Sequence, residues 1–198
     1  MNAGHFGLAA GVKAGAPRLP LWVLLLSSYL LDVIFVILFA LGQIEWFKPI
    51  DPAHPGYGAV VIYAPYTHSL IGALLIAAVA GLIASRWWGR QGGLVAAAVV
   101  FSHWLLDLLV HRPDLPILPG NAGNLPLLGL GLWQVPIVSA ALELALVLIG
   151  AYLYYRTAMH LPIASALDRS RQRRRALTAS GVTATLLVLV LVTDLMGL

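Results

Sequence analysis

Long apolar runs constrain the fold of this chain more than any other feature. A helix needs about 20 apolar residues to cross the hydrocarbon core of a bilayer. Runs of this length alternate with loops rich in Pro and Gly, such as KPIDPAHPGYG. Only 10% of the residues are charged, whereas an average soluble domain has about 25%. The expected spans are residues 19–41, 66–85, 92–110, 132–155 and 178–198.

These runs predict an all-α fold, a polytopic bundle of five transmembrane helices that forms a single membrane domain over residues 1–198. The Lys and Arg residues give its orientation, since cytoplasmic loops carry an excess of them. Of the 12 basic residues, only Lys48 and Arg112 fall on the side opposite the N-terminus. The N-terminus is therefore expected in the cytoplasm. The first span is expected to stay uncleaved, because its apolar core is too long for a signal peptide.

Topology also explains the positive net charge of +4. Five arginines lie in one short run, RSRQRRR, which is expected to anchor the last span on the cytoplasmic side. We therefore predict membrane lipids as partners and no nucleic acid. The chain has no cysteine, which excludes a disulfide, a thiolate metal site and a cysteine nucleophile.

Ionisable side chains recur at one depth of the expected bundle. Counted along each helix from its flanking cytoplasmic basic residue, they lie ~20–27 Å from that side. Each would cost about 2.5–3.5 kcal/mol at the bilayer centre if it faced lipid. We therefore expect these groups to face one another. They come from four different spans and are Asp32, His68, His103, Asp107 and Glu143.

A bound divalent cation is the simplest compensation for these carboxylates, because no Lys or Arg is expected at their depth. Ligands of the His, Asp and Glu types suit Zn²⁺ first, with Mn²⁺ or Fe²⁺ as alternatives. His5 adds a donor only if the N-terminal stretch GHFGLAAGVKAGAP enters the membrane as a short re-entrant helix. If that stretch is an amphipathic helix flat on the surface, His5 lies far from the site. The sequence leaves both arrangements open.

The segment FSHWLLDLLVH carries the strongest local signal. Positions i and i+4 share a helix face, so His103 and Asp107 can bind one ion together. The alternative is a hydrogen-bonded pair that holds helices together, as polar residues do in membranes. In YTHSL, His68 is either a ligand or a solvated residue beside a helix N-cap formed by Thr67 or Ser69.

Two further residues are candidates for catalytic proton transfer. Glu143 has the burial that suits a general base, and its alternative role is as partner to a polar neighbour. His111 follows Asp107 by four residues near the outer boundary. It is a last ligand, a proton shuttle or a solvated loop residue. His54 and His160 are expected outside the site, in a loop and on the cytoplasmic side.

Four motifs follow one another over about residues 4–120: GHFGLA, SSYLLDVI, YTHSLIGALL and FSHWLLDLLVHRPDLPILP. Their order and spacing, with the THSL and SHxxxD cores, resemble the bacterial membrane-bound metal-dependent hydrolases of the YdjM-like family. The resemblance implies a multi-pass protein of the bacterial cytoplasmic (inner) membrane. It also implies a set of metal ligands. These are His5, Asp32, His68, His103 and Asp107.

The stretch around Asp32 departs from the pattern of that family. Of the family's PDxDH-type stretch only the acid Asp32 is kept, and YAPY replaces the HRG before Thr67.

We expect a hydrolase that acts on an ester or phosphoester, namely a lipid at the outer leaflet. Glu143 or His111 would move protons in this reaction. The alternative is a non-catalytic accessory subunit of a larger membrane complex, or a homo-oligomer, with a degenerate or structural metal site. An ion conduit is disfavoured, because the cytoplasmic halves of the spans are almost wholly apolar.

Overall fold

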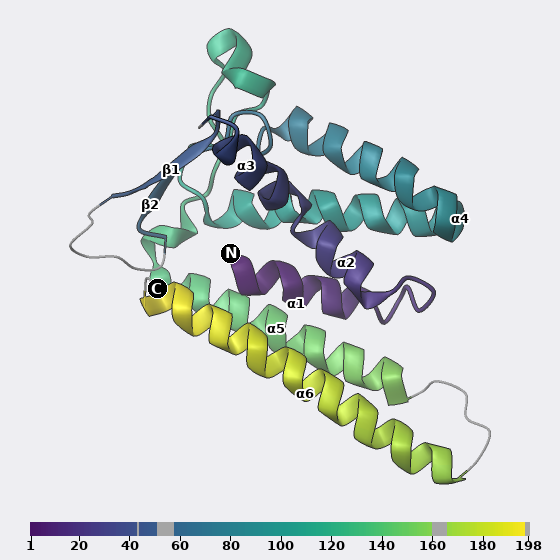
Figure 1. Ribbon diagram of the computed structural model, residues 1–198. Helices are drawn as coiled ribbons and strands as arrows, with labels where there is room; N and C mark the ends of the chain where they lie inside the picture. Colours follow the sequence, from purple (N-terminus) through teal and green to yellow (C-terminus); the bar gives the residue numbers. More distant parts are fainter. Residues whose placement is uncertain (43, 51–57, 160–165, 197–198) are drawn as a thin grey trace.

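The computed structural model describes residues 1–42, 44–50, 58–159 and 166–196, and within this part the fold is mostly helical. It is a helical bundle with one small antiparallel hairpin at one end (Figure 1). The predicted all-α class is confirmed. The elements are α1 (Asn2–Val12), α2 (Leu21–Ser28), α3 (Leu30–Ala40), β1 (Trp46–Pro49), β2 (Val60–Tyr63), α4 (Leu70–Val110), the 3₁₀ turns Pro119–Asn124 and Leu132–Gln134, α5 (Pro136–Met159) and α6 (Ala166–Met196).

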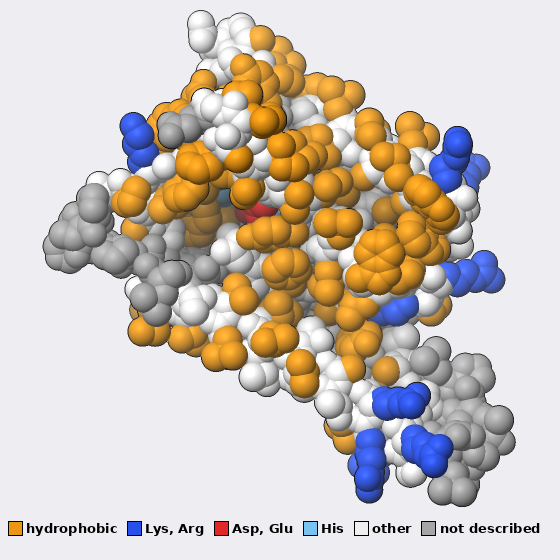
Figure 2. Space-filling model, viewed as in Figure 1, with side chains coloured by type: hydrophobic (Ala, Val, Ile, Leu, Met, Phe, Trp, Pro, Cys, Tyr) orange, Lys and Arg blue, Asp and Glu red, His pale blue; other side chains and the backbone are white. Residues whose placement is uncertain are grey.

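Several helices are long and apolar enough to cross a membrane. Among the described residues these are Leu70–Val110, Pro136–Met159 and Ser170–Thr193, and the bent pair α2 and α3 passes the same test when its two helices are taken together. Hydrophobic side chains cover the face shown in Figure 2, while Lys and Arg lie at its margins. Large apolar residues such as Leu75 and Leu82 are 60% and 71% exposed. A surface of this kind is consistent with a membrane protein.

The expected first span, 19–41, is not one straight helix. It breaks at Tyr29, whose backbone (φ −116°, ψ 8°) separates α2 from α3, and the two helices meet at 55°. The break follows the pair Ser27 and Ser28, and serine pairs are a known cause of helix kinks.

Helix α4 contains the expected span 92–110 and all of 66–85 except its first four residues, which precede the helix. Its backbone turns at Gly89 (φ 67°, ψ 178°), a conformation open essentially to glycine alone. The two halves run back along each other (Figure 1). A Cβ added at Gly93 would lie 2.5 Å from the carbonyl oxygen of Gly81, so the halves touch backbone to backbone. The helix begins after Ser69, whose hydroxyl accepts a hydrogen bond from the Gly72 amide at 3.1 Å, as an N-cap does.

Helix α1 lies inside the bundle, where it contacts α2, α4, α5 and α6 (Figure 1). Glycines line its face toward α5. A Cβ added at Gly7 would lie 2.7 Å from the backbone of Leu146, and one added at Gly150 would lie 2.0 Å from the Gly7 carbonyl oxygen. This small-residue contact brings the two backbones together. The N-terminal stretch therefore enters the bundle, so of the two arrangements that the sequence left open, the helix flat on the surface is ruled out.

The last two helices differ from expectation at their ends. Residues 132–134 form a 3₁₀ turn, and α5 begins at Pro136, a residue suited to a first helical position. Helix α6 begins at Ala166, so it includes the basic run that was expected to precede the span. His54, His160 and the end of the expected last span lie outside the described residues.

Candidate metal centre

The second half of α4 supplies the two side chains at the centre of the site. His103 Nε2 lies 3.1 Å from Asp107 Oδ2, one helical turn away, and the two side chains are 1% and 4% exposed. The expected pairing of these residues on one helix face is confirmed. Both point into the bundle, where they are shielded from bulk solvent.

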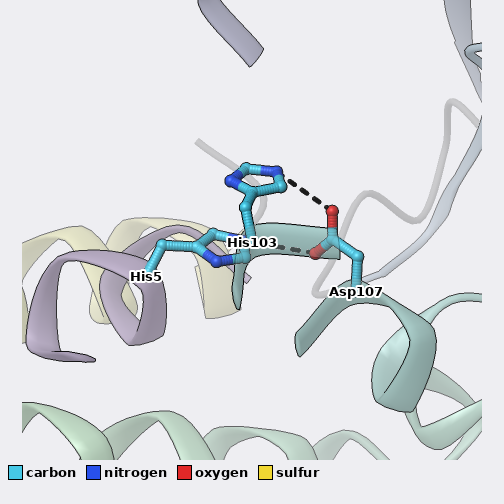
Figure 3. A group of neighbouring side chains, drawn as sticks. All are labelled: His5, His103 and Asp107. Carbon is cyan, nitrogen blue, oxygen red and sulfur yellow. Dashed lines mark hydrogen bonds and ion pairs between the residues drawn. The ribbon is translucent and has the colours of Figure 1, made fainter. Parts of the chain in front are cut away.

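His5 of α1 joins this pair, as Figure 3 shows. Its ring is stacked on that of His103 with centroids 3.7 Å apart, and its Nε2 lies 3.2 Å from Asp107 Oδ1. The two imidazoles thus approach opposite oxygens of one carboxylate. His5, His103 and Asp107 form one group of donor atoms close enough to hold a metal ion.

Asp32 of α3 and His68, just before α4, form a second group with the same His103. His68 Nε2 lies 3.3 Å from Asp32 Oδ1 and 3.4 Å from His103 Nε2. His103 Nε2 lies 3.5 Å from Asp32 Oδ1. Ligands at 2.0–2.1 Å in a tetrahedral site are ~3.3 Å from one another, so this triangle has the size of one tetrahedral face.

All five predicted ligands therefore lie together. The two groups share His103, whose single Nε2 lone pair serves one ion at a time. In the described part of the chain, Asp32 and Asp107 form their ion pairs with histidine side chains. The donors are the nitrogen and oxygen types that Zn²⁺, Mn²⁺ and Fe²⁺ accept. This buried group of His and Asp residues could hold a divalent metal ion.

The outward-facing nitrogen of each of three imidazoles has a hydrogen-bond partner. His103 Nδ1 is 2.7 Å from the carbonyl oxygen of Ser28, beside the break between α2 and α3. His68 Nδ1 is 2.8 Å from Thr67 Oγ1, and His111 Nδ1 is 2.9 Å from Asp114 Oδ1. A carbonyl or carboxylate can only accept, so Nδ1 of His103 and His111 carries the proton. Nε2 of each then faces Asp107, which is the orientation of the ligating nitrogen in metal-binding histidines.

His111 is buried, with 3% of its side chain exposed. The interpretation of His111 as a solvated loop residue is therefore wrong. Its ring packs against Trp133 at 4.3 Å, and its Nε2 lies 3.8 Å from Asp107 Oδ2. The segment after α4 folds back over the helix end and covers this residue. Its role as ligand or proton carrier stays a prediction.

Glu143 of α5 is fully buried and accepts a hydrogen bond from the Gly4 amide at 2.9 Å. It thus holds the first turn of α1, where free amides and the helix dipole favour a carboxylate. The described residues do not bring it into either group of metal donors. This hydrogen bond agrees with the alternative interpretation of Glu143, in which it is the partner of a polar neighbour.

Glu45 is a member of the site that the sequence did not suggest. It is fully buried and accepts three hydrogen bonds from the segment that carries His68. Its position at the end of an apolar run, in LGQIEW, was the available signal. Asp114, the partner of His111, was missed in the same way because it lies in a loop, where counting depth along a helix gives no position.

Asp32 is the exposed edge of the site. Its side chain is 24% exposed, against 4% for that of His68. In Figure 2 acidic atoms are visible in a recess between hydrophobic side chains, on a face otherwise covered by apolar groups. Asp32 is thus the part of the site that reaches the surface of the protein.

No family model, curated protein or solved structure matches this chain. The resemblance to membrane-bound metal-dependent hydrolases therefore stays a prediction.

Proposed function

We propose that this protein is a membrane-embedded, metal-dependent hydrolase of esters or phosphoesters, akin to the YdjM-like family. The proposal is carried by the triangle of Asp32 Oδ1, His68 Nε2 and His103 Nε2, whose sides measure 3.3 to 3.5 Å. Three protein ligands leave a coordination position open, which is typical of catalytic rather than structural zinc sites. A divalent ion bound there would lower the pKa of a water molecule and polarise a phosphoryl or carbonyl oxygen.

His111 is the residue best placed to move protons. Its Nε2 faces the Asp107 carboxylate, and Asp114 holds the opposite nitrogen. We assign it the role of accepting a proton from water while the water oxygen bonds to phosphorus or carbon. The ester bond then breaks, and the leaving alkoxide takes up that proton. Glu143, bound to the Gly4 amide, is assigned to holding α1.

A lipid substrate fits the way in which the site opens. Asp32 is the partly exposed edge of the site, and a substrate with acyl chains can approach it along the exposed apolar side chains of α3. The outward-facing side chains of α3, among them Val36 and Ile37, are more than half exposed. A soluble substrate would have to leave bulk water to reach this opening.

The membrane arrangement that goes with this function has five crossings. Residues 70–88 and 90–110 on the two sides of Gly89 each have about the length that a bilayer requires. With α5, α6 and the bent pair α2 and α3, they give five spans. The basic run of α6 and Lys13, after the end of α1, then lie on the cytoplasmic side of a bacterial inner membrane. Met1 packs against Val110 and Trp133 inside the bundle, so the chain starts near the site, toward the outer leaflet, and not in the cytoplasm as expected.

The test is hydrolysis of phospholipid by the purified protein. Wild type and Asp32→Asn would be incubated with mixed vesicles of zwitterionic and anionic phospholipid, with Zn²⁺ and with a chelator. We expect release of fatty acid or of phosphorylated headgroup by wild type with Zn²⁺ only. Folded, metal-loaded protein that is inert on these lipids would contradict the hydrolase and favour a structural metal site in an accessory subunit.

A further inference from the structure

We propose that Glu45 is a positioning residue that prepares His68 for metal binding by acting through the hydroxyl of Thr67. This inference rests on the metal centre of the proposed function. It concerns a residue outside the predicted ligand set, and it states which nitrogen of His68 carries the proton.

The contacts of Glu45 are all directed at the segment before α4. Its Oε1 accepts hydrogen bonds from the amides of Tyr66 at 2.8 Å and Thr67 at 2.9 Å. Its Oε2 accepts one from Thr67 Oγ1 at 2.6 Å. The carboxylate is fully buried, so its position is set by these three donors. The nearby N-terminus of α4 adds a favourable dipole.

The β hairpin brings Glu45 to this place. Strands β1 and β2 pair so that Trp46 lies opposite Tyr63. Glu45 precedes Trp46, and residues 64–67 follow Tyr63, so the two segments leave the hairpin side by side. The register of this four-residue strand pair thus places Glu45, which follows α3, beside the residues just before α4.

The direction of the Thr67 hydroxyl follows from what Glu45 can do. A carboxylate only accepts, so the Thr67 proton points to Glu45. The hydroxyl oxygen is then the acceptor in its 2.8 Å contact with His68 Nδ1. His68 must therefore carry a proton on Nδ1, so Nε2, which faces Asp32 and His103, is the nitrogen that can give its lone pair to an ion. This is a carboxylate–histidine–metal arrangement lengthened by one hydroxyl.

Substitution of Glu45 by Gln reverses this chain of hydrogen bonds with almost no change of shape. The Gln oxygen can keep the two backbone amides, while its NH₂ group donates to Thr67 Oγ1. The Thr67 proton then turns to His68 Nδ1, and the ring proton moves to Nε2, where it blocks metal binding. Thr67→Val breaks the chain in a different way and keeps both amide contacts of Glu45. Thr67→Ser preserves the hydroxyl.

The experiment is equilibrium binding of Co²⁺ and Zn²⁺ to the purified full chain, with the visible absorption of bound Co²⁺ as a spectroscopic readout. We expect Glu45→Gln and Thr67→Val to weaken binding about 10- to 100-fold, the usual effect of losing an outer partner of a ligand. Thr67→Ser should bind as wild type does. Thr157→Val is the matched control, since its hydroxyl donates to the Leu153 carbonyl oxygen within α5, away from the metal donors.

The outcomes separate the inference from the proposed function. Wild type that binds neither ion would contradict the metal centre itself, and Glu45 would lose its role with it. Wild-type binding with unchanged affinity in Glu45→Gln and Thr67→Val would overturn the inference alone. Equal weakening in Thr67→Ser and Thr67→Val would also overturn it, because the hydroxyl would then not be the cause.

Discussion

His103 Nε2 and Asp107 Oδ2 face each other at 3.1 Å across one turn of α4. The other oxygen of Asp107 faces His5 at 3.2 Å. His68 and His111 approach Oδ2 at 3.6 and 3.8 Å. One buried carboxylate thus meets four imidazoles from three parts of the chain. In this arrangement the ionisable side chains face one another, whereas each would cost free energy if it faced lipid inside a membrane.

Asp107→Asn should weaken metal binding while the protein stays folded. The amide keeps the shape but loses the negative charge that four imidazoles face, so Zn²⁺ affinity should fall about 10- to 100-fold, the loss expected for a residue that supports the ligands. Metal content of the purified variant measures this. Asp114→Asn is the control, because it alters only the partner of His111. It should retain metal and lower turnover, and metal loss there would contradict the assigned role.

Removal of metal should lower the thermal stability of the protein. An ion that binds only the folded state stabilises it by about 2.7 kcal/mol at a concentration 100 times its Kd. The measurement is the unfolding midpoint in detergent with Zn²⁺ and with chelator. An equal midpoint in both conditions would mean that no ion binds the folded state selectively.

Gly7→Ala should displace α1 and weaken the site. The new methyl group would lie 2.7 Å from the backbone of Leu146, which cannot rotate away. Overpacking of this kind costs about 1–3 kcal/mol, and His5 moves with the helix. Both the unfolding midpoint and Zn²⁺ affinity should fall.

Gly11→Ala is the matched control on the same helix. Its Cβ would lie 3.5 Å from the nearest atom of Gly150, an ordinary contact. Stability and Zn²⁺ affinity should stay close to wild type. Equal effects of the two substitutions would show that α1 does not hold His5 through this glycine contact.

Glu143→Gln and Glu143→Ala separate support of α1 from proton transfer. Gln retains an oxygen that can accept from the Gly4 amide, so turnover and metal content should persist. Ala leaves that buried amide without this acceptor, at a cost of about 1–3 kcal/mol. His111→Gln should retain metal and lose turnover. Loss of turnover in Glu143→Gln with metal retained would instead make Glu143 the proton carrier.

Helix geometry allowed four of the candidate metal ligands to be predicted as neighbours from the sequence. His103 and Asp107 share a helix face by spacing alone, and counting depth along straight helices matched them with Asp32 and His68. This works because helices in a bundle are nearly rigid rods of known rise. The same count also placed Glu143 in this layer, but Glu143 lies outside both groups of metal donors. The break at Tyr29 did not disturb the match, although Ser27 and Ser28 could have signalled it.

The rest of the site depended on contacts between distant segments. The position of His5 was left open because it requires the backbone contact of Gly7 with α5, which local sequence cannot show. Glu45 was missed because strand register, rather than helix rise, places it beside Thr67. His111 is buried only because the loop carrying Trp133 returns over it.

X-ray absorption of the zinc-loaded protein tests the central claim most directly. Zinc bound by these residues should show nitrogen and oxygen neighbours at about 2.0–2.1 Å, with the outer-shell scattering of at least two imidazole rings. His103→Ala should lose that signal. A zinc-loaded sample without imidazole scattering, or wild type that retains no zinc, would contradict a metal centre at His68, His103 and Asp32.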